Sequence, residues 1–554
     1  MVSKWLLAIL PGISFLAYCN LGLLRGAFWF RDNQDPDYVY LFSSLMLVNF
    51  EVPAHIDHPG TPYQILGAIV LRTLHLVWFH SENLIYSVLQ KPEIYLYAIY
   101  YTSIFLKSLS LFAVGWAMFY FSKNLILSLI IQTTPLVMVW SIVVRESSRV
   151  APESLLFIIS QLLIILLITY IYRDGANRKN WFWLGMGAII GIGMATKVTF
   201  LPAILFVFLI HGFWRKFAAI GIAALTFVLA TLPIISRYEK MFGWIWNLIV
   251  RKEAYGTGES GLINASSLWS NFLFLFTKSY VFFLITTFFT VVTLIVGFSL
   301  RKEKAPSALV KRCFYVAVIF CVGHWSFVFL ASNERPEIHY LTFQISLIGL
   351  SISILIIFFR HLLKQFTLSQ KVLKSIPAIG LTTCIVLSAY LFHTSSNRLS
   401  NVKDWYTTDA EAIQILHQDL KGCAWVYRDR ASDVKAALYF ADTWTHPDVL
   451  IPIPRKIYTD FSKRRFHAEL SNIYPDSLFL VSVSSQEKSF NRKSYFSYSD
   501  RHGFRQVLRE NGCIAIQQQA WHPAPEVPSK IKSKLDIQNV FQGYTESVFL
   551  IRRK

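Results

Sequence analysis

Charged side chains gather in short segments of an otherwise apolar chain, and their types suit acid–base and phosphate chemistry. The segment RDNQDPDY contains Asp35 and Asp37, and the segment HIDHPGTP contains Asp57 and His58. A carboxylate in such a segment could remove a proton from an acceptor hydroxyl, while nearby cations hold a phosphate leaving group. The two segments therefore supply candidates for a general base and for groups that orient its substrate.

Both segments also allow a purely structural interpretation. Asp35 followed by Pro36 suits the start of a helix near Asp37, because aspartate caps helix N-termini and proline is favoured at the first helical position. The tripeptide His58-Pro59-Gly60 suits a plain turn. Acidic clusters, a histidine and an arginine in one loop at a membrane surface nevertheless favour function, since ionisable groups there are costly.

Further charged residues stand at the ends of apolar runs. Arg149 and Glu153 flank the start of one run, Lys197 interrupts another, and Arg335 and His339 precede a third. A solvent-side Arg149–Glu153 salt bridge is the structural alternative for the first pair. Neither Lys197 nor Arg335 has an acidic partner at i ± 4 in its own span. A cation beside lipid needs an anion or must extend to the surface, so we expect both to converge on an anionic ligand.

The composition places much of the chain in lipid. Of 554 residues, 54% are hydrophobic and only 16% are charged, against roughly 25% charged in an ordinary soluble domain. The mean hydropathy is +0.43. The formal net charge is +20, but the basic residues lie largely in short loops between apolar runs. This arrangement indicates membrane topology and not nucleic-acid binding.

Long apolar runs predict an α-helical polytopic membrane protein with about eleven transmembrane helices. The runs cover residues 5–24, 93–121, 124–144, 151–172, 181–195, 198–213, 217–235, 272–299, 313–331, 340–359 and 375–392. Basic residues concentrate in the loops 173–179, 301–312 and 360–374, which alternate correctly to share one side. By the positive-inside rule we expect these loops and the amino terminus to be cytoplasmic.

Residues 64–79 are apolar but short for a span, and they carry Arg72 and His75. We expect an amphipathic helix that lies on the outer leaflet. If this segment crossed the membrane, the basic loops would face outwards, which the charge bias disfavours. Residues 25–92 are then one long outer loop.

The composition changes at His393, after which mixed polar sequence alternates short apolar runs with helical patterns. We expect residues 1–392 to form the transmembrane module and residues 393–554 to form a soluble α/β domain outside the membrane. Cys423 and Cys513 lie in this domain. They could form a disulfide in an oxidising compartment or stay free, and two cysteines without geometry do not decide between these outcomes.

Under this topology the charged segments all emerge on the outer face. Segments far apart in sequence that share one face are expected to assemble one site at the outer membrane interface.

The order and spacing of these motifs resemble the GT-C class of membrane glycosyltransferases, in particular the protein O-mannosyltransferases and the lipid A aminoarabinose transferases. The likeness covers about residues 1–360. Asp35-Pro36-Asp37 is similar to the acidic motif of the first loop in that class, where Asp-Glu is usual. The remaining elements are Asp57-His58-Pro59-Gly60, Arg149-Val150-Ala151-Pro152-Glu153, Gly193-Met194-Ala195-Thr196-Lys197 and His339-Tyr340.

The resemblance implies a GT-C-like fold and an inverting transfer of sugar from a polyprenyl or dolichyl phosphate to a glycan, lipid or protein acceptor. Asp35, which matches the first acid of the pair, would be the catalytic base, with Asp37 as the other candidate. The donor phosphate would be bound by cations among Arg149, Lys197, Arg335 and His339, with Glu153 in the same element. Asp57 and His58 would orient acceptor or sugar.

No cofactor is predicted, since tethered cations can neutralise a phosphate monoester leaving group, although a divalent metal would be compatible. We expect a plasma or inner membrane location in a bacterium and a lumenal active site in a eukaryote. A non-catalytic transporter or lipid flippase is the alternative, but it needs polar groups near mid-membrane, whereas these charges lie at one face.

Overall fold

A computed structural model describes most of the chain. The chain divides into two compact units. The described residues are 2–57, 59–133, 149–251, 261, 263, 265–303, 306–334, 337–365, 370–428, 431–448, 463–475, 478–480, 495–496, 501–521 and 532–554.

The first unit comprises residues 1–21, 56–63 and 101–396, and the second comprises 22–55, 64–100 and 397–554. The unit boundary at 396/397 lies close to the predicted boundary at 392/393. Residues 25–92, which we predicted as a loop of the transmembrane module, fall mostly in the second unit with the C-terminal domain.

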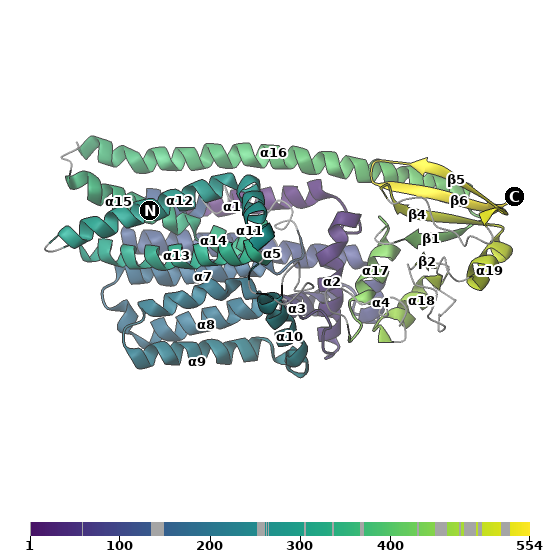
Figure 1. The fold of residues 1–554 in the computed structure, drawn as a ribbon, viewed down its shortest axis with the longest axis horizontal. Coiled ribbons are helices and arrows are strands. Elements are labelled where there is room, and N and C mark those ends of the chain that lie inside the picture. Colours follow the sequence, from purple (N-terminus) through teal and green to yellow (C-terminus); the bar gives the residue numbers. More distant parts are fainter. Residues whose placement is uncertain are drawn as a thin grey trace. The chain divides into compact units, whose positions relative to one another are not determined.

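The first unit is helical (Figure 1). Its elements are α7 (Glu153–Tyr172), α8 (Asn180–Thr196), the 3-10 helix η2 (Val198–Leu209), α9 (Phe213–Ala230), α10 (Tyr238–Val250), α11 (Ala265–Lys278), α12 (Tyr280–Lys302), α13 (Ala308–Glu334), the 3-10 helix η5 (Ile338–Leu341), α14 (Thr342–Ser346) and α15 (Ile348–Gln365). Helices α1 (Val2–Arg25), α5 (Pro92–Ser122) and α16 (Gln370–Asp419) contribute to both units.

Among the described residues, six helices are long and apolar enough to cross a membrane, or seven if the bent pair 338–346 and 348–363 is one span. These helices make the chain an integral, multi-pass membrane protein. The predicted run 272–299 is two helices, because α11 ends at Lys278 and Ser279 leaves helical geometry before α12 begins. The predicted run 198–213 is largely the 3-10 helix η2, and most of 124–144 lies outside the described residues.

Close helix packing in the first unit depends on small residues. Gly187 and Gly191, one turn apart on α8, face backbone oxygens of Ala219 and Ala223 on α9. A Cβ at either glycine would collide with those oxygens. Small residues at this spacing let helices approach closely in membranes, where van der Waals contact drives association.

The second unit carries a six-stranded sheet in the order β3-β2-β1-β4-β6-β5. The strands are β1 (Ala424–Arg428), β2 (Leu478–Leu480), β3 (Tyr495–Phe496), β4 (Cys513–Gln519), β5 (Leu535–Gln542) and β6 (Glu546–Arg553). Its helices are α2 (Arg31–Val48), α3 (Thr61–Trp78, shared with the first unit), α4 (Leu84–Gln90), the C-terminal part of α16, α17 (Val434–Thr443), α18 (His467–Ile473) and α19 (Arg501–Asn511). The C-terminal part of the chain thus contains a small sheet together with helices.

Strands β1 to β4 are parallel, whereas β6 pairs antiparallel with both β4 and β5. Strands β1 and β4 are neighbours in the sheet. After β1 the chain continues to β2 on one side of this pair, and after β4 it continues to β5 on the other side. In open α/β sheets this arrangement places a crevice at the carboxyl ends of the two strands. A disulfide joins Cys423 and Cys513 at the start of these strands, which answers the question that the sequence left open.

Candidate functional site

A buried ion pair occupies one end of the first unit. Lys197, the residue after α8, donates a hydrogen bond to the Glu153 carboxylate, the first residue of α7. Their side chains are 2% and 5% exposed. Two charges removed from water in this way stabilise a protein only when they are well paired and further hydrogen-bonded. The pair therefore joins two helices and concentrates charge at one place in an apolar unit.

Backbone geometry explains the position of the lysine. Lys197 is extended (φ −161°, ψ 131°), and its N–H donates to the Gly193 carbonyl at 2.9 Å, which closes the last turn of α8. The chain then continues as η2, whose Phe200 ring lies against Gly193. Only glycine fits beside that ring, so the Gly-x-x-x-Lys pattern has a packing cause as well as a charged end.

Aromatic and titratable groups of η5 border the ion pair. The Lys197 ammonium lies 5.2 Å from the centroid of the Tyr340 ring, an arrangement typical of a cation–π contact. His339 stacks edge-on against Tyr340 with centroids 4.4 Å apart, and its Nδ1 lies 3.9 Å from the Glu337 carboxylate. The structure thus brings together three predicted site residues from α7, α8 and η5, namely Glu153, Lys197 and His339.

Lys197 has no acidic partner at i ± 4 in its own span, but it has one on another helix, Glu153. The alternative of a solvent-side Arg149–Glu153 salt bridge is wrong, because both side chains are buried.

Of the remaining predicted site residues in the first unit, two are buried and two lie outside the described residues. Arg149 and Asp57 are buried, with 3% and 5% exposure. His58 and Arg335 lie outside the described residues, so the convergence of Arg335 and Lys197 stays a prediction. A buried guanidinium and a buried carboxylate are unusual enough in an apolar unit to keep Arg149 and Asp57 as site candidates.

In the second unit, Asp37 is held by an arginine that sequence reasoning missed. Arg25 Nη2 lies 2.5 Å from Asp37 Oδ2, and the two side chains are 4% and 0% exposed. The guanidinium also stacks over the Phe28 ring at 4.7 Å. Arg25 ends the first span and Asp37 follows 12 residues later on the next helix, so no pattern within one helix relates the two.

Asp35 is placed differently from Asp37. It is half-buried, and its backbone (φ −110°, ψ 117°) interrupts α2, with Pro36 starting the continuous part of the helix. The predicted helix start at Asp35-Pro36 corresponds to this break. Asp37 is fully buried whereas Asp35 is half-buried, so Asp35 is the more accessible carboxylate of the two.

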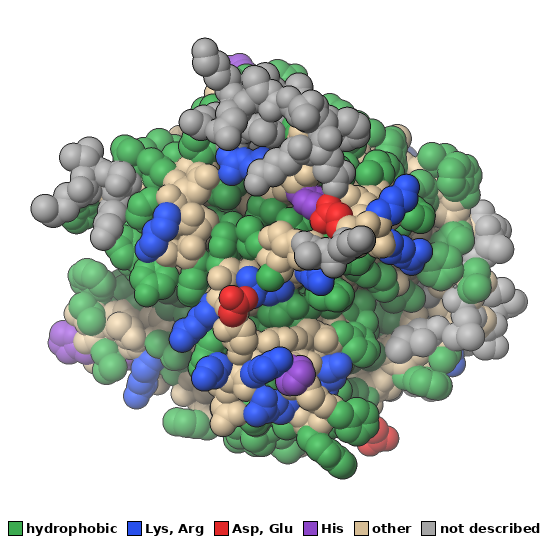
Figure 2. All heavy atoms as spheres, turned by 90° about the vertical axis from the view of Figure 1, so that its left-hand side faces the viewer, with side chains coloured by type: hydrophobic (Ala, Val, Ile, Leu, Met, Phe, Trp, Pro, Cys, Tyr) green, Lys and Arg blue, Asp and Glu red, His purple; other side chains and the backbone are tan. Residues whose placement is uncertain are grey.

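The basic loops lie at the other end of the first unit from the Lys197–Glu153 pair. Arg312 pairs with Asp174, which joins the start of α13 to the loop after α7. Figure 2 shows the end where these helices turn, with Lys and Arg side chains standing among apolar ones and few acidic side chains in view. Helix α7 has 20 residues, or about 30 Å at 1.5 Å per residue, and separates Glu153 from this basic end.

A cavity of about 520 Å³ lies in the second unit. Tyr427 of β1, Gln517 of β4 and Asp433 at the start of α17 border it, which places it in the crevice at the carboxyl side of β1 and β4. Trp29 and Phe30 add aromatic surface. Burial raises the pKa of Asp433, and burial lowers the pKa of the neighbouring His417 to about 4, which keeps that imidazole neutral at pH 7.

No protein-family model and no curated protein matches the sequence. The structure, however, aligns with the crystal structure of ArnT from Cupriavidus metallidurans bound to undecaprenyl phosphate. The alignment covers 97% of this chain and 97% of that chain, at a TM-score of 0.50 and 10% sequence identity. The fold is of the GT-C type.

This likeness confirms the family resemblance seen in the motifs at the level of the fold, and it extends beyond residue 360 to nearly the whole chain. Among the described residues, no group of three or more His, Cys, Asp or Glu side chains could hold a metal ion. The described charges can bind an anion and can accept a proton.

Proposed function

We propose that this protein transfers a sugar from a polyprenyl phosphate to an acceptor hydroxyl at the membrane surface, with inversion at the anomeric carbon. The observation that carries this proposal is the full-length GT-C-type fold, whose solved example, ArnT, was crystallised with undecaprenyl phosphate. The buried cation at the end of α8 supports it, because an ammonium held in an apolar unit suits a lipid-linked phosphate.

In the proposed reaction, Asp35 removes the proton of the acceptor hydroxyl as its oxygen attacks the anomeric carbon. The bond between that carbon and the phosphate oxygen breaks, and its electron pair leaves with the polyprenyl phosphate. Lys197 stabilises the charge that develops on the phosphate. Attack opposite the leaving group inverts the configuration of the sugar.

The Glu153 carboxylate orients the Lys197 side chain before the donor arrives. An ammonium group has three donor positions, so a hydrogen bond to Glu153 leaves capacity for phosphate oxygens. Arg149 and His339, which lie in the segments around the pair, are the further proposed phosphate contacts. The roles of Asp57 and His58 in orienting acceptor or sugar belong to the same proposal.

The cavity at the carboxyl side of β1 and β4 is the proposed binding site for a glycan part of the acceptor. Its size falls in the usual range for small-molecule sites, and aromatic faces with a few polar groups suit a polyhydroxylated ring. The carboxyl groups of Glu411 and Asp433 outnumber the one lysine of the lining, Lys435, which disfavours a phosphate. Trp29→Ala should then raise the KM for acceptor and leave donor binding unchanged.

Donor binding can be tested on the full chain in detergent. Undecaprenyl phosphate should raise the melting temperature and appear in mass spectra of the purified protein, whereas undecaprenol, which lacks the phosphate, should do neither. Equal effects of both lipids would contradict recognition of the phosphate. Movement of intact lipid-linked sugar across vesicles, without transfer to any acceptor, would instead establish the flippase alternative.

A further inference from the structure

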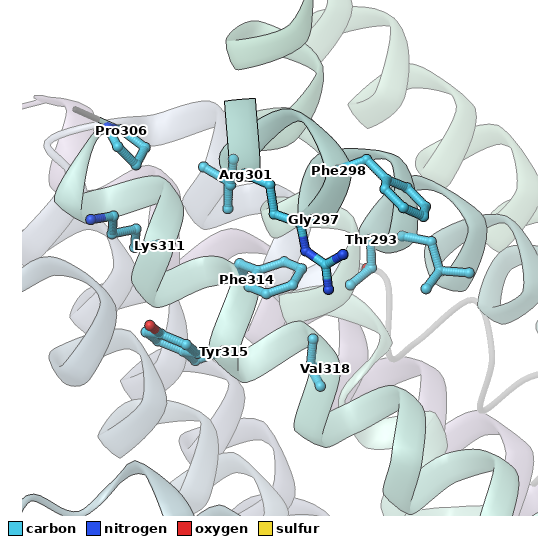
Figure 3. A pocket seen from close by; sticks show the side chains of 11 residues that line it. Thr293, Gly297, Phe298, Arg301, Pro306, Lys311, Phe314, Tyr315 and Val318 are labelled. Atoms are coloured by element: carbon cyan, nitrogen blue, oxygen red, sulfur yellow. The ribbon is translucent and has the colours of Figure 1, made fainter. Parts of the chain in front are cut away.

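A second anion-binding feature lies at the end of the first unit remote from Lys197. Helices α12 and α13 enclose a cavity of about 320 Å³ near the turn that joins them (Figure 3). Leu294, Phe298, Phe314 and Val318 form its apolar wall, and Arg301 and Lys311 supply two cations. Figure 3 shows the Arg301 guanidinium reaching into the centre of the cavity.

The two cations have no carboxylate partner among the described residues. The acidic groups nearest in sequence are engaged elsewhere, since Glu303 lies 3.1 Å from His361 and Asp174 pairs with Arg312. The guanidinium carbon of Arg301 lies 5.8 Å from the centroid of the Phe298 ring. The cavity therefore keeps a net positive charge, which an anion would balance.

The apolar wall faces lipid and not water. Leu294, Phe298 and Tyr315 are 60%, 63% and 53% exposed, and they stand on helices that meet the requirements for membrane spans. Gly297 forms part of the wall, and a Cβ there would approach the Phe314 ring at 3.0 Å. The absence of a side chain at this position keeps the groove between the helices open.

We propose that this cavity binds an anionic glycerophospholipid, with its phosphate between Arg301 and Lys311 and an acyl chain along Phe298, Phe314 and Val318. Basic pockets between membrane helices take lipid head groups in this manner. The last residue of α13 that lines the cavity is Val318, and 16 further residues of that helix follow it, a length of about 24 Å. Lys197 is not among the residues that line the cavity. The lipid is thus a bound partner of the protein and not the sugar donor.

The test is native mass spectrometry of the full chain, with phosphatidylglycerol and phosphatidylcholine offered in equal amounts. The wild type should retain phosphatidylglycerol preferentially, and R301Q/K311Q should lose this preference by on the order of 30-fold, the effect of two charges near a lipid surface. Lys302→Gln is the matched control, because Lys302 is exposed on the same turn but does not line the cavity. It should behave as wild type.

Gly297→Leu fills the groove without changing charge, and it should also reduce retention. Equal losses of the preference for phosphatidylglycerol in Lys302→Gln and in R301Q/K311Q would mean that general surface charge retains the lipid, and this result would overturn the proposal. Displacement of the lipid by millimolar inorganic phosphate would also overturn the proposal, since the site would then bind a free anion and not specifically a lipid. Undecaprenyl phosphate binding should be unchanged in every variant, so the result is independent of the proposed transferase activity.

Discussion

The pair formed by Lys197 and Glu153 allows donor binding to be separated from structural stability. Replacing one member leaves the other as a buried charge without its partner, because the side chains are only 2% and 5% exposed. Such a loss typically costs about 3–5 kcal/mol. Lys197→Met and Glu153→Gln should therefore each lower the melting temperature markedly.

The double variant E153Q/K197M removes both charges together. Replacing both members of a buried pair is often close to neutral for stability, so most of the lost melting temperature should return. Donor affinity should not return, because the ammonium that contacts the phosphate is still absent. A lost charge-assisted hydrogen bond is worth about 1.5–3 kcal/mol, or roughly 10- to 150-fold in dissociation constant.

The assay is the titration of undecaprenyl phosphate into the full chain in nanodiscs, with melting temperature measured on the same samples. Asp174→Asn is the control, since its carboxylate is 89% exposed and pairs with Arg312 in the same unit. An exposed pair contributes about 0–1 kcal/mol. Wild-type donor affinity in the double variant would refute the role of Lys197, whatever happens to stability.

Three further predictions concern other parts of the chain. Asp35→Asn should lower turnover by about 10² or more with donor affinity unchanged, as expected for loss of a general base. Normal turnover in Asp35→Asn would mean that Asp35 is not the general base. Asp37→Asn should chiefly lower stability, because it removes the carboxylate that pairs with the buried Arg25. Burial raises the pKa of Glu546 from 4.5 to about 8, so the contribution of this side chain to stability is complete below pH 4.5 and is lost as the pH rises through 8. The melting temperature of the wild type should therefore fall relative to that of Glu546→Gln between pH 4.5 and pH 8. Parallel curves of melting temperature against pH would contradict this prediction. A membrane-impermeant thiol reagent applied from outside should label a cysteine introduced at position 450 but not one at 305, and the reverse would overturn the topology.

The sequence was sufficient to predict the membrane class and to single out several charged residues, because both depend on local composition. Long apolar runs indicate membrane spans, and Arg149, Glu153 and Lys197 stand out in apolar surroundings. The family resemblance rested on the order of such residues, and the fold comparison confirmed it.

Pairings between distant residues could not be predicted in the same way. Glu153 and Lys197 meet because α7 and α8 pack together, and no periodicity within either helix encodes that contact. Arg25 and Asp37 lie on different helices for the same reason. The break at Ser279 was hidden because apolar residues continue on both sides of it, and hydropathy responds to composition but not to backbone direction.

The glycines of α8 have a consequence for how this protein can vary. Gly187 and Gly191 admit the backbone of α9, Gly193 admits the Phe200 ring, and all three precede Lys197 on one short helix. A side chain at any of them would force α8 away from its neighbours and carry the lysine with it. In a saturation-mutagenesis library, tolerated substitutions on α8 should therefore avoid these glycines and collect at lipid-exposed positions such as Leu184 and Ile192. Positions that never touch a substrate would then be as restricted as the charged residue whose location they fix.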